Sequence, residues 1–155
     1  MVEDFSPLQQ PLGSFSCLPT AIASILINHF HVSVSPGDVS DWCNEDPLGC
    51  VLDLAIDGLR HNGWLMQQLK IDPEAEMRAF VNDEDDPTPV IAIVKPGTQF
   101  ATDHAVVVLG FEHIRDDIET VYFMDPMSGQ IVSMYASEFM KYWDYAGQLA
   151  YYISD

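Results

Sequence analysis

The chain has 155 residues, 48% of them hydrophobic and 19% charged, a composition that excludes a disordered acidic tail and a low-complexity polymer. Six Lys and Arg stand against 24 Asp and Glu, which leaves a net charge of −18 at pH 7. Because the cations are few and scattered, this charge excludes nucleic-acid binding and disfavours an anionic membrane surface. The same charge favours a basic or amine-bearing substrate.

The length and the apolar runs together indicate a single compact unit. A chain of this size can bury a sizeable core, and we expect residues 1–155 to form one domain. Every apolar run falls short of the ~18 residues that a membrane span needs, so no membrane insertion is expected. The N-terminus is acidic where a secretory signal is basic. We therefore expect a cytoplasmic chain, or a domain excised from a larger or exported protein.

Four helices are predicted in the first half of the chain. They are expected at residues 18–30, at 36–42 after Ser35, from 51 to the Asn62-Gly63 pair, and from Asp72-Pro73 to about 81. Proline in a first helical turn, a serine or aspartate cap and a terminal glycine are the signals that set these limits. An acidic connector containing prolines follows at residues 82–89.

The second half is rich in predicted strands. They are expected at residues 90–94, 105–109, 120–124, 130–134 and 149–153, with one helix at 136–143 that has Ser133 or Ser137 near its start. The third and fourth of these strands are expected to pair across a turn at residues 125–129. The order of elements predicts an α+β fold, with a helical N-terminal half packed on a C-terminal antiparallel sheet.

Cys17 lies at the start of the first predicted helix, immediately before Leu18-Pro19. Unpaired N–H groups and the positive end of the helix dipole favour a thiolate at that position. Thiolate is the attacking form of cysteine, and a thiol at a helix N-terminus beside an imidazolium titrates well below the usual ~8.5. Cys17 is therefore a candidate nucleophile.

His104 and Asp125 are the candidate partners of this thiol. His104 begins one predicted apolar strand, and Asp125 ends the next. If the two strands are adjacent and antiparallel, the two side chains can meet, and the carboxylate would orient the imidazole toward the thiol. Asp103 is the weaker partner candidate, because it would point to the opposite face of the strand.

The ordered set of Gln9-Gln10, SCLPTAIASIL, DHAVVVLGF, VYFMDPMSG and the late SEFMKYW resembles the papain-like cysteine peptidases, specifically their C39-like branch. The resemblance implies a papain-like (C39-like) fold. It implies Cys17 as nucleophile, His104 as general base and later acid, and Asp125 as the group that orients His104. It also implies an oxyanion hole formed by the Cys17 N–H and a glutamine side chain.

The sequence departs from the family pattern at two places. Pro11 occupies the position where the family has its glutamine, so Gln10, or alternatively Gln9, is the candidate for the oxyanion hole. Leu18 replaces the usual glycine after the cysteine, which would narrow access to the thiol.

These observations predict a cysteine hydrolase that cleaves amide or peptide bonds through a thioester, with a peptide or protein as substrate. A glutamine deamidase or an acyl transferase would use the same groups. A peptide-binding module that keeps the fold without turnover is the alternative from another class. Neither a phosphate-binding glycine loop nor metal-ligand spacing occurs in the sequence, so we predict no cofactor and no metal. Three cysteines are an odd number in a chain large enough to fold without disulfides, which argues against a disulfide framework, although pairing of Cys43 with Cys50 stays open.

Overall fold

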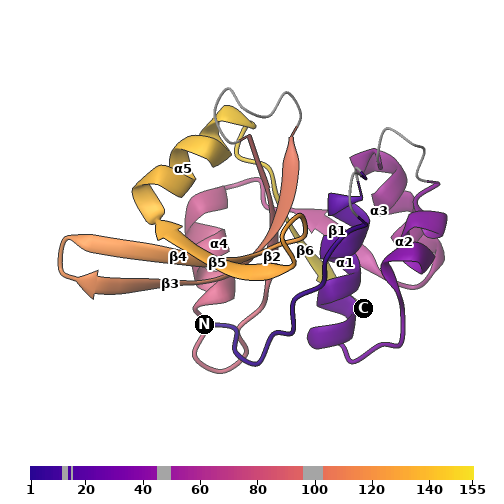
Figure 1. The fold of residues 1–155 in the computed structure, drawn as a ribbon, viewed down its shortest axis with the longest axis horizontal. Coiled ribbons are helices and arrows are strands. Elements are labelled where there is room, and N and C mark those ends of the chain that lie inside the picture. Colours follow the sequence, from indigo (N-terminus) through magenta and orange to yellow (C-terminus); the bar gives the residue numbers. More distant parts are fainter. Residues whose placement is uncertain (12–13, 15, 45–49, 96–102) are drawn as a thin grey trace.

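Figure 1 shows the fold in a computed structural model, which describes residues 1–11, 14, 16–44, 50–95 and 103–155. Its helices are α1 (Cys17–Asn28), α2 (Pro36–Trp42), α3 (Leu52–His61), α4 (Pro73–Val81) and α5 (Ala136–Tyr145). Its strands are β1 (Leu65–Gln68), β2 (Val90–Val94), β3 (His104–Arg115), β4 (Ile118–Asp125), β5 (Gln130–Tyr135) and β6 (Ala150–Ser154). No helix in these ranges is long and apolar enough to cross a bilayer.

The strands form one six-stranded sheet in the order β1-β6-β2-β3-β4-β5. Every neighbouring pair is antiparallel, as the α+β prediction requires. The β4–β5 hairpin closes where it was predicted, with Asp125 opposite Gln130. One strand was missed: β1 lies in the half of the chain that we expected to be purely helical. This four-residue segment pairs with the C-terminal β6, a long-range contact that its short sequence does not signal.

The helices cover both faces of the sheet. In Figure 1, α1, α2 and α3 lie together on one side, and α4 and α5 lie on the other. Successive side chains of a strand point to opposite faces, so Ile91 and Ile93 pack with the α1 side, whereas Val90, Ala92 and Val94 pack with the α5 side. A strand buried on both faces explains why β2 is apolar at all five positions.

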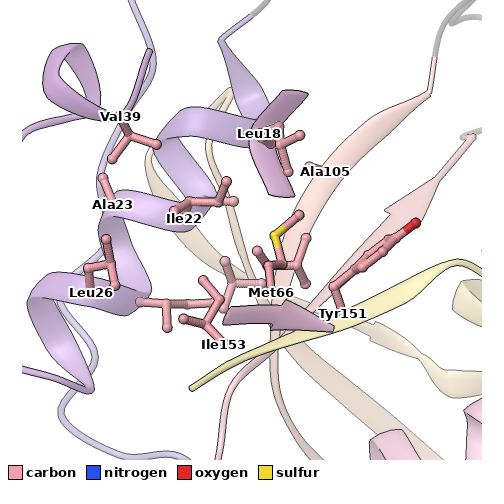
Figure 2. Packing of buried hydrophobic residues seen from close by; sticks show 14 of the residues in the cluster. Leu18, Ile22, Ala23, Leu26, Val39, Met66, Ala105, Tyr151 and Ile153 are labelled. Atoms are coloured by element: carbon pink, nitrogen blue, oxygen red, sulfur yellow. The ribbon is translucent and has the colours of Figure 1, made fainter. Parts of the chain in front are cut away.

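The core on the α1 side holds the helix that carries Cys17. Figure 2 shows Leu18 and Ile22 of α1 in one buried cluster with Met66 of β1 and Ile153 of β6. These side chains are at most 5% exposed, and burying a Leu or Ile contributes about 1.5–3 kcal/mol. This packing holds the first turn of α1 at a defined place beside the sheet.

Two helices, α2 and α4, are capped by the side chains that the sequence indicates. Ser35 and Asp38 form a reciprocal capping box at α2, and the Asp72 side chain accepts a hydrogen bond from the Ala75 N–H at α4. Ser133 and Ser137 lie near the start of α5, as expected, but Tyr135 occupies the N-cap and contributes no side-chain hydrogen bond. The preceding strand β5 runs directly into α5, so no separate capping turn is present.

The N-terminal segment runs along the β3–β4 hairpin before it reaches α1. The Val2 N–H donates to the Leu109 carbonyl oxygen at 2.8 Å, and the Gln10 N–H donates to the Pro126 carbonyl oxygen at 2.8 Å. These two bonds bring the glutamine pair to the β4–β5 turn, next to Asp125.

Candidate active site

Cys17 is the first residue of α1 and is partly exposed. Its helix start has no side-chain cap, because the Ser16 hydroxyl makes no capping hydrogen bond to the helix. Leu18, which stands where the family has glycine, is 5% exposed and packs in the core cluster on the α1 side. The thiol lies at the N-terminal end of α1, where the positive end of the helix dipole favours a negatively charged sulfur.

His104 and Asp125 meet because β3 and β4 are adjacent and antiparallel. Val107 pairs with Met124, and continuing this register places Val106 opposite Asp125 on one face of the sheet. His104 lies two residues before Val106 and therefore on the same face. From there its Nε2 reaches the Asp125 Oδ1 at 2.6 Å, a short, charge-assisted hydrogen bond.

The β4–β5 turn holds the Asp125 carboxylate in place. The Met127 N–H donates to the Asp125 Oδ1 at 2.9 Å, and the Gly129 N–H donates to the Asp125 carbonyl oxygen at 2.8 Å. Gly129 has φ +67°, and a Cβ there would come within 2.6 Å of the Gln9 Cβ. Glycine is therefore required at this position both by the left-handed backbone and by the close approach of the N-terminal segment.

The thiol of Cys17 contacts both the imidazole and the backbone of β3. The Ala105 N–H donates to the Cys17 Sγ at 3.5 Å, and the His104 imidazole is near enough to the thiol to lower its pKa. Because the His104 Nε2 is engaged with Asp125, the ring nitrogen left for the sulfur is Nδ1. The structure thus brings the thiol from α1, the imidazole from β3 and the carboxylate from β4 together in one place.

The pKa values of the three groups move in the directions that favour a charged pair. Burial raises the pKa of Cys17, but the hydrogen bond with His104, the Ala105 N–H and the imidazolium charge together lower it below the usual value of a thiol. Burial lowers the pKa of His104, whereas its bonds with Asp125 and Cys17 raise it to about 9. Burial raises the pKa of Asp125, yet the bonds with His104 and the Met127 N–H lower it overall. At neutral pH these directions favour thiolate beside imidazolium.

The two candidate glutamines differ in burial and in contacts. Gln10 is 6% exposed, and its Nε2 donates to the Ser14 carbonyl oxygen at 2.8 Å, in the loop that leads into α1. Gln9 is exposed, and its Nε2 donates to the Met127 carbonyl oxygen at 3.3 Å. The buried Oε1 of Gln10 has no hydrogen-bond partner among the described residues. Because Gln10 is buried and is bonded to the segment just before Cys17, it is the better candidate for the oxyanion hole.

Sequence reasoning missed the backbone groups of the site. The N–H groups of Ala105 and Met127 contact the sulfur and the carboxylate, respectively. Every residue except proline has a backbone N–H, so the residue types at positions 105 and 127 could not indicate that these groups contact the site. Only the placement of β3 beside α1 and the geometry of the turn bring them to the site.

The remaining sequence candidates lie outside this group of three side chains. Asp103 is exposed and precedes β3. Cys43 is buried in the core cluster on the α1 side, and Cys50 packs against the same cluster. No disulfide joins the three cysteines, all of which the structure describes.

Comparisons with known proteins agree with the fold. The model of the Peptidase_C39 like family matches residues 2–151. The peptidase domain of Streptococcus ComA, a bifunctional ABC transporter, has 18% sequence identity and a TM-score of 0.73, with 97% of this chain and 98% of that chain covered. The peptidase domain of Streptococcus mutans ComA has 16% identity and a TM-score of 0.64 over 97% of this chain and 100% of that one.

A third solved structure is a double glycine motif protease from an AMS/PCAT transporter in complex with the leader peptide. It has 17% identity and a TM-score of 0.67, and it covers 98% of this chain and 95% of that chain. No curated protein matches the chain. The structural likenesses show the fold, and the family model spans nearly all of the sequence. The chain therefore belongs to the Peptidase_C39-like family and is a cysteine peptidase-like enzyme with the papain-like fold of that family.

Proposed function

We propose that this enzyme hydrolyses peptide bonds through a triad of Cys17, His104 and Asp125. The observation that carries the proposal is the meeting of the three groups, with 2.6 Å between the Asp125 carboxylate and the His104 imidazole and with the thiol bonded to the N–H of Ala105, the residue after His104. A peptide is the proposed substrate for two reasons. A nucleophilic thiol in a peptidase fold can attack the carbonyl carbon of a peptide bond. A protease of similar fold was solved in complex with a leader peptide.

In the first step the Cys17 thiolate attacks the carbonyl carbon of the scissile bond and forms a tetrahedral intermediate. His104 then gives its proton to the leaving nitrogen, the C–N bond breaks, and a thioester remains on Cys17. A water molecule next gives a proton to His104 and attacks the thioester carbonyl. The C–S bond breaks, the acid product leaves, and thiolate and imidazolium are restored.

The developing oxyanion needs donors, and we propose the Cys17 N–H and the side-chain amide of Gln10. Gln10 is supported over Gln9 by its burial and by its bond to the loop before Cys17. Asp125 keeps its charge throughout and holds the imidazole so that Nδ1 faces the sulfur.

The triad is tested by alkylation of the protein with iodoacetamide across pH, with each cysteine quantified separately by mass spectrometry. We expect the midpoint of the rate at Cys17 to lie below the ~8.5 at which an unperturbed thiol rises, because the pKa of Cys17 is lowered. His104→Ala should return Cys17 to the unperturbed profile and lower peptide cleavage at least ~10²-fold. Cleavage of a mixed peptide library should vanish in Cys17→Ala. Unchanged turnover in that variant would contradict the proposal.

The oxyanion donor is tested by a matched pair of variants. Gln10→Ala should lower kcat about 10²–10³-fold, the usual effect of removing one oxyanion donor, while the alkylation profile of Cys17 stays unchanged. Gln9→Ala is the control, and we expect its turnover to stay within a few-fold of the parent. The opposite ranking of the two variants would assign the role to Gln9.

A further inference from the structure

A pocket of about 220 Å³ lies beside the His104–Asp125 pair, on the face of the sheet that α5 covers. Its volume is several times the ~30 Å³ that one water occupies in the liquid, so it has room for a large side chain. Apolar residues from five elements line it: Val94, Val106, Phe123, Val132, Met134 and Phe139. The mechanism proposed above leaves this pocket without a role.

The chemistry of the lining selects for apolar groups. Val94, Val106, Phe123 and Phe139 are each at most 6% exposed, whereas Val132 and Met134 are partly exposed. The ionisable groups of the wall are already engaged, because Asp125 is bonded to His104 and the Tyr142 hydroxyl donates to Glu138. A charged side chain in the pocket would lose its hydration without gaining a partner, whereas an apolar one would gain by burial.

The position of the pocket relates it to one side of the scissile bond. In the proposed acylation step, His104 protonates the leaving nitrogen, so that nitrogen must lie within hydrogen-bond reach of the imidazole. The first residue after the scissile bond carries this nitrogen on its Cα. The side chain of this residue is attached to the same Cα, so it begins one atom beyond the nitrogen that His104 protonates. The same imidazole and its carboxylate partner form one wall of the pocket.

We propose that this pocket binds the side chain of the residue that follows the scissile bond and selects a branched or aromatic apolar residue there. This specificity rests on the proposed function, because it uses the proton transfer from His104. A close-fitting apolar pocket discriminates by about 10- to 100-fold against a side chain that leaves it empty. Peptides with Leu, Ile or Phe after the cleaved bond should be preferred over those with Gly by this factor.

Cleavage of a mixed peptide library, with cut sites read by mass spectrometry, tests the preference. In Val132→Phe the added ring should fill the pocket and shift the cut sites toward Gly, Ala and Ser, while iodoacetamide labelling of Cys17 stays unchanged. Ile131→Phe is the matched control, because Ile131 is the exposed neighbour on the opposite face of β5. Met134→Ala, which enlarges the pocket, should shift the preference toward larger residues. A parent profile without apolar preference, or identical profiles for the two phenylalanine variants, would overturn the proposal.

A second measurement does not depend on turnover. Leucinamide and glycinamide mimic the leaving amine, and their binding is followed by NMR of the Val94 and Val106 methyl groups. We expect leucinamide to bind at least about 10-fold more tightly than glycinamide, and Val132→Phe to abolish the difference. Equal binding of the two amides would overturn the pocket assignment even if cleavage occurs. Tighter leucinamide binding without any cleavage would retain the pocket as a ligand site and would overturn the proposed function together with the specificity role.

Discussion

The imidazole of His104 contacts an acid on each side, and this double contact governs the chemistry of the site. Asp125 stabilises the imidazolium from one side, and the thiolate of Cys17 stabilises it from the other. Each partner raises the pKa of His104, and the charged imidazole in turn lowers the pKa of Cys17. The ion pair therefore exists from the lowered pKa of Cys17 up to about pH 9, where His104 loses its proton. Changing any one of the three groups should shift the titration of the others.

Asp125→Asn tests this coupling. The amide keeps the shape but cannot balance the imidazolium charge, so the pKa of His104 should fall below about 9 and the pKa of Cys17 should rise. The midpoint of Cys17 alkylation should move to higher pH, and peptide cleavage at pH 7 should fall ~10²-fold or more. Asp103→Asn makes the same chemical change at the exposed residue just before His104 and should leave the midpoint in place. An unshifted midpoint in Asp125→Asn would remove Asp125 from the triad.

At the scale of the elements, the α1 side of the molecule depends on close helix contacts. Gly58 lies within α3, where glycine normally weakens a helix. A Cβ at this position would come within 2.1 Å of the Trp42 carbonyl oxygen at the end of α2. The glycine thus allows the backbones of α2 and α3 to approach, and this approach keeps both helices packed in the cluster that holds α1.

Gly58→Ala should therefore destabilise the protein although alanine is the better helix former. Relief of the clash requires α2 and α3 to move apart, and we expect the free energy of unfolding to fall by about 1–3 kcal/mol. Urea denaturation measures the change. Gly37→Ala in α2 is the control, since its Cβ would lie 3.6 Å from the Ser35 Oγ, an ordinary contact, and its stability should equal or exceed that of the parent. A stabilised Gly58→Ala would show that the two helices separate at no cost.

At the scale of the whole molecule, the sheet separates two cores with different tasks. The core on the α1 side positions the nucleophile, and the core on the α5 side supports the strand ends that carry His104 and Asp125 and the pocket beside them. The surface around both cores is strongly acidic. Six cations cannot pair with 24 carboxylates, so most of the negative charge is balanced only by solvent ions. Such an excess of one sign opposes the compact state through mutual repulsion.

Sodium chloride should therefore stabilise the protein. Raising the concentration from about 0.02 M to 0.3 M shortens the Debye length below ~10 Å and screens the repulsion. We expect the midpoint of thermal unfolding to rise by about 2–4 °C, which corresponds to an increase of ~1 kcal/mol in the free energy of unfolding for a protein of this size. Choline chloride at equal ionic strength should give the same rise. A midpoint that falls with salt, or that responds to only one of the two salts, would contradict charge repulsion as the cause.

Local signals predicted most of the elements, and their failures have physical reasons. The capping box of Ser35 and Asp38 and the Asp72-Pro73 start determine α2 and α4 from adjacent residues, so these helices were predicted closely. The strand β3 extends to Arg115, well beyond the apolar stretch that predicted it, because its outer part pairs with β4 in an exposed hairpin. The strand β1 escaped prediction because its partner, β6, lies at the other end of the chain.

The residue types of the candidate triad could be chosen from the sequence alone, because a cysteine at a helix start and a histidine and an aspartate at strand ends are local features. Their meeting could not be inferred in the same way, since it depends on the antiparallel pairing of β3 with β4 and on the packing of α1 against the sheet. The backbone donors and the apolar pocket beside His104 likewise arise from long-range packing. Local sequence dictates backbone conformation and chemical type, whereas distances between groups remote in the chain exist only once the core has formed.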